Sequence, residues 1–231
     1  MNIAQDLKEK FLDNFNMLSG MLRSMRGDPQ AWEASILRFE ARDRLQPVPP
    51  GTILFTGSSS ITLWSSLVQD MAPLPVLNRG FGGSRMADMV HYAERVVRPC
   101  NPRTVVLFAG TNDIADPKPA TARQVFEGYL GFVNAVQACL PGVPIYFISI
   151  TPTPLRWKYW PVVQEANRLI RAHTRTDPAL HFIDIAGTFL GPDGRPDRRL
   201  FRRDRLHPNA RGYEKWTALI KPVLLADLLP K

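Results

Sequence analysis

Residues 1–27 carry apolar side chains at three- and four-residue spacing, which predicts an amphipathic helix. The apolar positions are Ile3, Leu7, Phe11, Phe15, Leu18, Leu22 and Met25. Gly27-Asp28-Pro29 ends this pattern, and a second helix is predicted over residues 30–45. A proline-rich stretch at residues 47–51 then breaks the chain. We expect residues 1–50 to form a helical extension packed on the main domain, although such helices could instead make a homo-oligomer contact or lie on a membrane surface.

Beyond this extension, short apolar runs alternate with longer amphipathic runs. The short runs predict strands at Ile53–Thr56, Pro75–Asn78, Thr104–Ala109, Pro144–Ile150 and His181–Ile185. The longer runs predict helices at Ile61–Gln69, Arg85–Val97, Ala120–Cys139, Trp160–Thr176 and Asn209–Leu228. This alternation predicts a parallel sheet with helices on both faces, so residues 51–231 are expected to form one α/β domain.

Polar segments follow the first four predicted strands. They are residues 58–60, 78–83, 110–113 and 151–154. In sheets of this kind the active site lies beyond the carboxyl ends of the strands. We therefore expect the four segments to meet at one edge of the sheet.

The residue types in these segments could together support a nucleophilic reaction. The serines at residues 58–60 stand at a strand-to-helix turn, and a serine hydroxyl needs a base to become a nucleophile. His207 is the candidate base, because Asp204 three residues earlier can accept its Nδ1–H and turn Nε2 toward the serine. Gly83 could bring a backbone N–H close to an oxyanion, and Asn112 could offer its side-chain amide. Taken singly, each segment is equally typical of a turn or a helix cap.

Composition and charge narrow the choice of partners. The chain is 45% hydrophobic and 22% charged, as in ordinary globular domains, and its formal net charge is +8. Six arginines fall within residues 195–205, where a solvated loop is favoured over a binding patch. The arginines accompany no nucleic-acid motif, so no nucleic-acid partner is expected. Cys100 and Cys139 form no spacing motif, and no His/Cys pattern indicates a metal.

The sequence also lacks an apolar run long enough to cross a membrane. Charged residues near the N-terminus make that segment a poor signal peptide. We therefore expect no integral membrane segment and a cytoplasmic protein.

From about Thr52 to the C-terminal helix, the chain resembles the SGNH hydrolases, also called the GDSL esterase/lipase family. The family is named for Ser, Gly, Asn and His in four blocks. These correspond here to Ser59, Gly83, Asn112 and His207, with Asp204 completing a triad. The family's first block is usually Gly-Asp-Ser, and here it is Gly57-Ser58-Ser59. An ungapped alignment places the nucleophile at Ser59, whereas Ser60 would require an insertion.

The resemblance implies a three-layer α/β/α sandwich with a mainly parallel, flavodoxin-like five-stranded sheet and an N-terminal helical extension. It also implies ester hydrolysis through an acyl-enzyme intermediate, with Ser59 as nucleophile and His207 and Asp204 completing the triad. The backbone N–H groups of Ser59 and Gly83 and the amide of Asn112 would hold the oxyanion. No cofactor or metal is required.

The substrate is expected to be a small-molecule ester with a small or medium acyl group. Residues near the predicted edge that could bind it are Phe81, Arg85, Ile114 and Trp157. The alternatives within the enzyme class are a carbohydrate O-acetylesterase and a lysophospholipase-like lipid esterase. A non-catalytic binding protein is the alternative outside it, and only Ser58, in place of the usual Asp, favours it.

Overall fold

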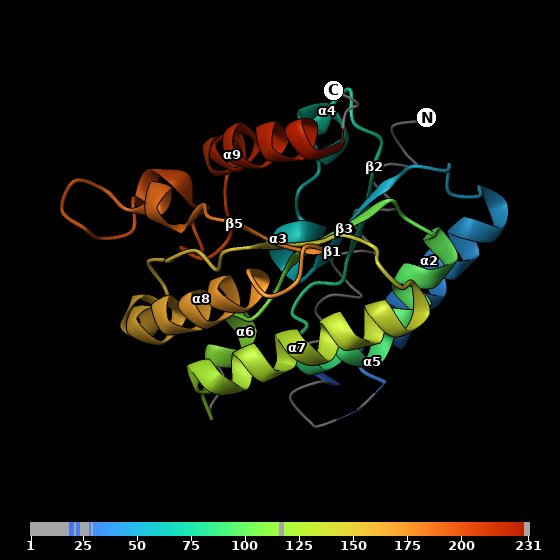
Figure 1. The fold of residues 1–231 in the computed structure, drawn as a ribbon. Helices are drawn as coiled ribbons and strands as arrows, with labels where there is room; N and C mark the ends of the chain where they lie inside the picture. The colour runs from blue at the N-terminus through green and yellow to red at the C-terminus, as the bar shows by residue number, and fades with distance from the viewer. Residues whose placement is uncertain (1–18, 21, 24–27, 29, 116–117, 229–231) are drawn as a thin grey trace.

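The computed structural model describes residues 19–20, 22–23, 28, 30–115 and 118–228 (Figure 1). The helix predicted over residues 1–27 lies largely outside the described residues. The homo-oligomer contact suggested for it therefore stays a prediction. None of the helices described is both long and apolar enough to span a membrane.

A five-stranded parallel sheet forms the centre of the fold. Its strands are β1 (Ile53–Gly57), β2 (Val76–Gly80), β3 (Thr104–Phe108), β4 (Ile145–Ile148) and β5 (Leu180–Ile183). They lie in the order β2-β1-β3-β4-β5, and every neighbouring pair is parallel. The predicted α/β fold with a flavodoxin-like sheet is therefore confirmed, with strand limits that differ from the prediction by a few residues.

Helices cover both faces of this sheet (Figure 1). One face is covered by α2 (Glu33–Leu45), α5 (Met86–Val97), α7 (Ala122–Cys139) and α8 (Trp160–Thr174). The other is covered by α3 (Ser59–Thr62), α4 (Leu67–Met71) and α9 (Ala210–Leu228). The short helix α6 (Thr111–Ile114) follows β3, and 3₁₀ turns occur at Arg98–Cys100, Trp157–Tyr159, Ala186–Phe189 and Arg198–Leu200.

Side chains of successive strand residues point to opposite faces of the sheet and so divide the core into two clusters. Side chains toward α5, α7 and α8 include Leu54, Val105, Leu107, Ile145 and Phe147. Side chains toward α4 and α9 include Ile53, Phe55, Val106, Phe108, Tyr146 and Ile148. Successive residues of a strand point to opposite faces, so strands that are apolar throughout supply both clusters at once.

The single helix predicted over Ile61–Gln69 was wrong, because the chain forms two short helices, α3 and α4, with a turn between them. The turn is held by Asp70, whose Oδ2 accepts hydrogen bonds from Trp64 Nε1 at 2.6 Å and from Ser66 Oγ at 2.6 Å. Trp64 and Leu67 still reach the same core cluster, which explains why their spacing resembled one continuous helix.

Helix α2 packs against α5 and the end of β2. Arg95 on α5 pairs with Glu33 at 2.8 Å and with Glu40 at 2.7 Å. Buried Arg79 on β2 pairs with Asp43. These contacts place the second helix of the predicted extension on the main domain, while the division of the chain at residue 50 stays a prediction.

Candidate active site

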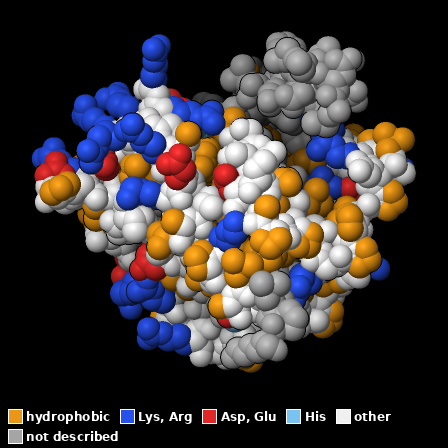
Figure 2. Space-filling model, turned by 90° about the horizontal axis from the view of Figure 1, so that it is seen from above, with side chains coloured by type: hydrophobic (Ala, Val, Ile, Leu, Met, Phe, Trp, Pro, Cys, Tyr) orange, Lys and Arg blue, Asp and Glu red, His pale blue; other side chains and the backbone are white. Residues whose placement is uncertain are grey.

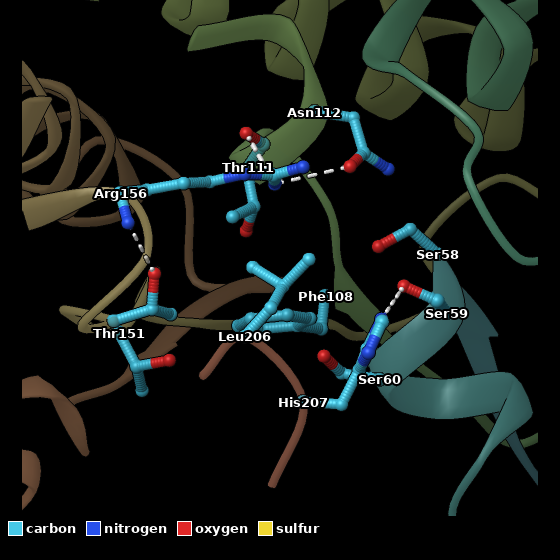
Figure 3. Close-up of a pocket in the computed structure, with 11 residues that line it drawn as sticks. Ser58, Ser59, Ser60, Phe108, Thr111, Asn112, Thr151, Arg156, Leu206 and His207 are labelled. Carbon is cyan, nitrogen blue, oxygen red and sulfur yellow. Dashed lines mark hydrogen bonds between the residues drawn. The ribbon is translucent and has the colours of Figure 1, made fainter. Parts of the chain in front are cut away.

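The edge of the sheet beyond the strand ends brings together a serine, a histidine and an aspartate. Ser59 Oγ lies 2.8 Å from His207 Nε2 (Figure 3). His207 Nδ1 lies 2.7 Å from Asp204 Oδ2. The Ser59 side chain is nearly buried, whereas that of His207 is 16% exposed and that of Asp204 is 44% exposed. The arrangement is a continuous hydrogen-bonded chain from a carboxylate through an imidazole to a hydroxyl.

Asp204 is held in its ionised form by its neighbours. Burial opposes the charge, but hydrogen bonds from the His207 ring and from the backbone N–H groups of His207 and Leu206 outweigh it and lower the pKa of Asp204. The two N–H groups reach the other carboxylate oxygen, Oδ1, at 3.0 and 2.9 Å. The carboxylate therefore keeps both its charge and its direction toward Nδ1.

The end of β1 sets the position of Ser59. Gly57 has a φ of +146°, and a Cβ atom there would lie 2.1 Å from the Phe108 carbonyl oxygen on β3. The next residue, Ser58, donates its backbone N–H to that same oxygen at 3.1 Å. The chain can therefore turn sharply from β1 into α3 and present Ser59 at the first helical position. Tyr213 on α9 fixes α3 from behind, because its hydroxyl donates to the Ser60 carbonyl at 2.9 Å.

The segments after β2 and β3 supply Gly83 and Asn112. Gly83 has a φ of +91°, a conformation that favours glycine. The two segments are joined because Asn112 Nδ2 donates to the Ser84 carbonyl at 2.9 Å. Within the described chain, the backbone N–H groups of Ser59 and Gly83 donate to no protein acceptor. They are free to bind an anionic oxygen.

A small pocket, with about 10 Å³ of free space, opens between these groups. It is lined by Ser58, Ser59, Ser60, Phe108, Thr111, Asn112, Thr151, Thr153, Arg156, Leu206 and His207. Figure 3 shows Ser59 and His207 on one side of the pocket and Asn112 and Arg156 on another. Three of the four polar segments predicted to meet at the sheet edge line this pocket, whereas residues 78–83, and Gly83 with them, do not; the adjacent Ser84 accepts a hydrogen bond from Asn112, which does.

A second small pocket, also with about 10 Å³ of free space, adjoins the first and shares Thr111, Thr151, Thr153 and Arg156 with it. It continues along Ile114, Pro152, Tyr159, Trp160 and Val163. Of the four predicted substrate-binding residues, Ile114 lines this pocket. Trp157 does not, but its ring stacks on that of Trp160, with centroids 6.1 Å apart.

The other two predicted substrate-binding residues lie elsewhere. Phe81 is 2% exposed and packs against Trp32 and Tyr92 in the core. Arg85 caps helix α5, where its backbone N–H donates to Asp88 at 2.8 Å. Neither residue lines either of the two pockets. Because both residues follow strand β2 in the sequence, they were expected near the edge of the sheet. Sequence position alone does not determine where their side chains point.

Two charged residues to which the sequence assigned no catalytic role adjoin the site. Asp113 accepts the Met86 backbone N–H at 3.1 and 3.2 Å, and burial raises its pKa to about 6. Arg156 Nη1 donates to the Asn112 side-chain oxygen at 3.1 Å and to the Thr111 carbonyl at 2.9 Å. Asp113 stands next to Asn112 in the predicted polar segment 110–113, whereas no sequence spacing connects residue 156 to residue 112.

The arginine-rich segment 195–205 borders the site, because it contains Asp204. All six of its arginines are exposed. Arg199 pairs with Asp197 at 2.8 Å, and Arg202 donates to the Leu63 and Pro208 carbonyls at 3.3 and 3.1 Å. Figure 2 shows Lys and Arg side chains gathered on one side of the face seen from above. The approach to the site is therefore bordered by positive charge.

Within the described part of the chain, no group of three His, Cys, Asp or Glu side chains could hold a metal ion. The chemistry that this geometry can support is proton transfer and nucleophilic attack by side chains, with backbone and amide N–H groups to receive negative charge.

Comparison with known proteins identifies the class. The sequence matches the GDSL-like lipase/acylhydrolase family over residues 42–215. It is 28% identical over 185 residues to platelet-activating factor acetylhydrolase IB subunit alpha1 of Homo sapiens, an alignment that covers 75% of each chain. The family match spans most of the chain. The protein therefore belongs to the GDSL-like lipase/acylhydrolase family, a family of carboxylic-ester hydrolases.

Solved structures agree on the fold. A GDSL-like lipase from Bacteroides thetaiotaomicron superposes with a TM-score of 0.70 at 20% identity, covering 84% of this chain and 98% of that chain. A carbohydrate esterase family 3 structure from Talaromyces cellulolyticus gives a TM-score of 0.58 at 17% identity, covering 77% and 97%. At these identities the likeness concerns the fold alone.

Proposed function

We propose that this protein is a serine esterase that hydrolyses esters of small or medium acyl groups through an acyl-enzyme intermediate. The observation that carries the proposal is the hydrogen-bonded chain from Asp204 through His207 to Ser59. A hydroxyl placed 2.8 Å from an imidazole, whose other nitrogen faces a carboxylate, is arranged to lose its proton as it attacks a carbonyl.

The first step forms the acyl-enzyme. Ser59 Oγ bonds to the acyl carbon while its proton passes to His207 Nε2, and the carbonyl oxygen becomes an oxyanion. The backbone N–H groups of Ser59 and Gly83 and the Nδ2 of Asn112 are the proposed donors to that oxygen. His207 then protonates the alcohol oxygen as the carbon–oxygen bond breaks.

The second step releases the acid. A water molecule gives a proton to His207 Nε2 and attacks the acyl carbon of the Ser59 ester. The oxyanion is held by the same donors, and the proton returns to Ser59 Oγ as its bond to carbon breaks. Asp204 keeps its charge throughout and stabilises the imidazolium that forms twice in each cycle.

The size of the pocket supports a short acyl group. Its free space, about 10 Å³, is no more than about one water molecule needs, so the pocket is narrow beside Ser59. Phe108 and Leu206 give it apolar walls next to the reactive groups. The relative named an acetylhydrolase favours the same end of the range, and we place acetyl esters first.

A chain-length series tests this proposal. We expect p-nitrophenyl acetate and butyrate to be hydrolysed with higher kcat/KM than the octanoate ester. Replacing Ser59 with alanine should remove this activity and labelling by a fluorophosphonate probe, while Ser60→Ala should retain both. A Ser59→Ala variant that kept full activity would show that another residue is the nucleophile.

A phospholipid-like ester is the second candidate for the substrate. The exposed arginines of residues 195–205 lie beside Asp204 and could pair with a phosphate group. The name of the relative, platelet-activating factor acetylhydrolase, points the same way. Comparing acetylated sugars, short aryl esters and short-chain phospholipids in one panel would separate this candidate from a carbohydrate O-acetylesterase. A phospholipid preference should weaken when Arg203 and Arg205 are replaced together by glutamine.

A further inference from the structure

The side-chain amide of Asn112 is held at both ends. Its Nδ2 donates to the Ser84 carbonyl at 2.9 Å, and its Oδ1 accepts from Arg156 Nη1 at 3.1 Å. Arg156 comes from the segment after β4 and lies 44 residues from Asn112 along the chain. The same Nη1 donates to the Thr111 carbonyl at 2.9 Å, so the guanidinium joins the backbone and side chain of the α6 turn.

We propose that Arg156 is a positioning residue for the oxyanion site, which orients and polarises the Asn112 amide. This inference rests on the proposed role of Asn112 as an oxyanion donor. An amide has a donor end and an acceptor end of nearly equal size. If the amide turned over, it would present Oδ1 to the developing negative charge, and the two oxygens would repel one another. The guanidinium opposes this because it can only donate.

The remaining hydrogen on Nδ2 is the one available to the substrate. An amide nitrogen carries two hydrogens, and the Ser84 carbonyl takes one of them. With Oδ1 occupied by Arg156, the other hydrogen is directed away from both partners. Asn112 also lines the pocket that contains Ser59, so this hydrogen can reach an oxygen bound there.

The charge of Arg156 strengthens this donor. Burial lowers the pKa of Arg156 to about 10, with Tyr159 and Asp113 acting in the opposite direction, so the guanidinium remains a cation at neutral pH. A cation bound to the amide oxygen draws electron density from the nitrogen, and hydrogen bonds linked in this way reinforce one another. Arg156 forms no salt bridge with a described carboxylate, so direct ion pairing does not cancel its charge.

A different role would leave a different kinetic signature. Arg156 lines both pockets, so it could instead contact the substrate directly. Direct contact would act mainly on KM, and mostly for anionic esters. Support of the oxyanion donor would act on kcat, because the negative charge exists only in the transition state and intermediate.

Single substitutions test the role first. With p-nitrophenyl acetate we expect Arg156→Met to lower kcat by about 10- to 100-fold, less than the loss of a whole oxyanion donor, while KM changes by less than about twofold. Arg156→Lys should recover part of the loss, because it keeps a charged donor. Arg168→Met is the matched control, since this arginine is exposed and, among the described residues, its ion pair is with Glu165, three residues earlier on the same helix. Melting temperatures of all variants identify any that fail to fold.

A double-mutant cycle then tests whether Arg156 acts through Asn112. In an Asn112→Ala background, Arg156→Met should change kcat by less than about threefold, because the residue it positions is gone. An equal loss in both backgrounds, or a rise in KM with unchanged kcat, would overturn the inference. If Asn112→Ala alone retained wild-type kcat, the proposed oxyanion role of Asn112 would fail instead. Arg156→Lys carries the same cycle if Arg156→Met does not fold.

Discussion

The Nε2 atom of His207 lies 2.8 Å from the Oγ atom of Ser59, although 148 residues separate them in the chain. The contact depends on helices α3 and α9, which are also joined by a second hydrogen bond. Ser59 begins α3, His207 shortly precedes α9, and Tyr213 of α9 donates to the Ser60 carbonyl at 2.9 Å. The packing of α9 against α3 therefore sets the distance between the proposed nucleophile and its base.

Asp204 provides the sharpest test of the proposed triad. We expect Asp204→Asn to lower kcat by about 10³- to 10⁴-fold with little change in KM, because asparagine cannot stabilise the imidazolium and can hold the wrong tautomer. Steady-state kinetics on p-nitrophenyl acetate would measure this. Asp193→Asn, at an exposed aspartate in the same loop region, should be close to wild type. A loss below tenfold at Asp204 would argue against the triad.

Asp113 should make stability depend on pH. Burial raises its pKa to about 6 from 3.8, so between these values the folded chain binds more protons than the unfolded chain. The contribution of Asp113 to the free energy of unfolding therefore decreases as pH rises from about 4 to about 6. Asn at this position can still accept from Met86 but does not titrate. Relative to wild type, the free energy of unfolding of Asp113→Asn should therefore rise by about 2–3 kcal/mol between about pH 4 and about pH 6.

Urea unfolding of the two proteins at pH 4, 5, 6, 7 and 8 measures that difference. It should grow up to about pH 6 and then level off, since the carboxyl group is ionised in both states above that pH. A difference that stayed constant or shrank with rising pH would contradict the prediction. Asp193→Asn serves again as a control, in which no such trend is expected.

Removing Asp43 should leave a buried charge without its partner. The Arg79 side chain is 1% exposed and pairs with Asp43, and its guanidinium lies 4.9 Å from the centroid of the Phe39 ring. We expect Asp43→Ala to cost about 3–5 kcal/mol of unfolding free energy. Glu94→Ala, which breaks the exposed pair with Arg98, should cost less than about 1 kcal/mol. If chemical denaturation gave similar losses of unfolding free energy for Asp43→Ala and Glu94→Ala, Arg79 would have to be solvated.

Gly57 is required by space as well as by backbone conformation. A Cβ atom at this position would meet the Phe108 carbonyl at 2.1 Å, and that oxygen belongs to the rigid sheet. Gly142→Ala is a matched control, because its φ is +77° and a Cβ atom would meet nothing within 4 Å. The control should cost about 1–2 kcal/mol from conformation alone. Gly57→Ala should cost at least about 1–3 kcal/mol more. Equal melting temperatures for the two variants would contradict this.

Much of the fold could be predicted from the sequence because its signals are local. The run predicted over Thr104–Ala109 is apolar from Val105 onward, as is typical of strands covered on both faces, and the chain indeed forms β3 there. The meeting of the polar segments follows from topology, since all parallel strands end at one edge. For this reason Ser59 and Asn112 could be selected together, and the spacing of Asp204 and His207 added the base, although their catalytic roles stay predictions.

The remaining features depend on contacts that no local pattern records. The break between α3 and α4 comes from the Asp70 carboxylate, while the apolar spacing of Trp64 and Leu67 still fits one helix. Phe81 follows a strand as predicted, but tertiary packing turns its ring into the core. The hydrogen bond from Arg156 to Asn112 joins two loops that only the completed sheet brings together.

The two core clusters on opposite faces of the sheet divide the proposed chemistry between them. Helix α3 holds Ser59, and helix α9 follows His207. Both helices pack into the cluster that contains Ile61 and Trp216. The turn that holds Asn112 is anchored through Ile114 in the other cluster. The proton-transfer groups and the Ser59 N–H are thus supported by one layer, and the Asn112 donor by the other. Repacking the layer around Ile114 should therefore shift the Asn112 donor while the contact between Ser59 and His207 keeps its geometry.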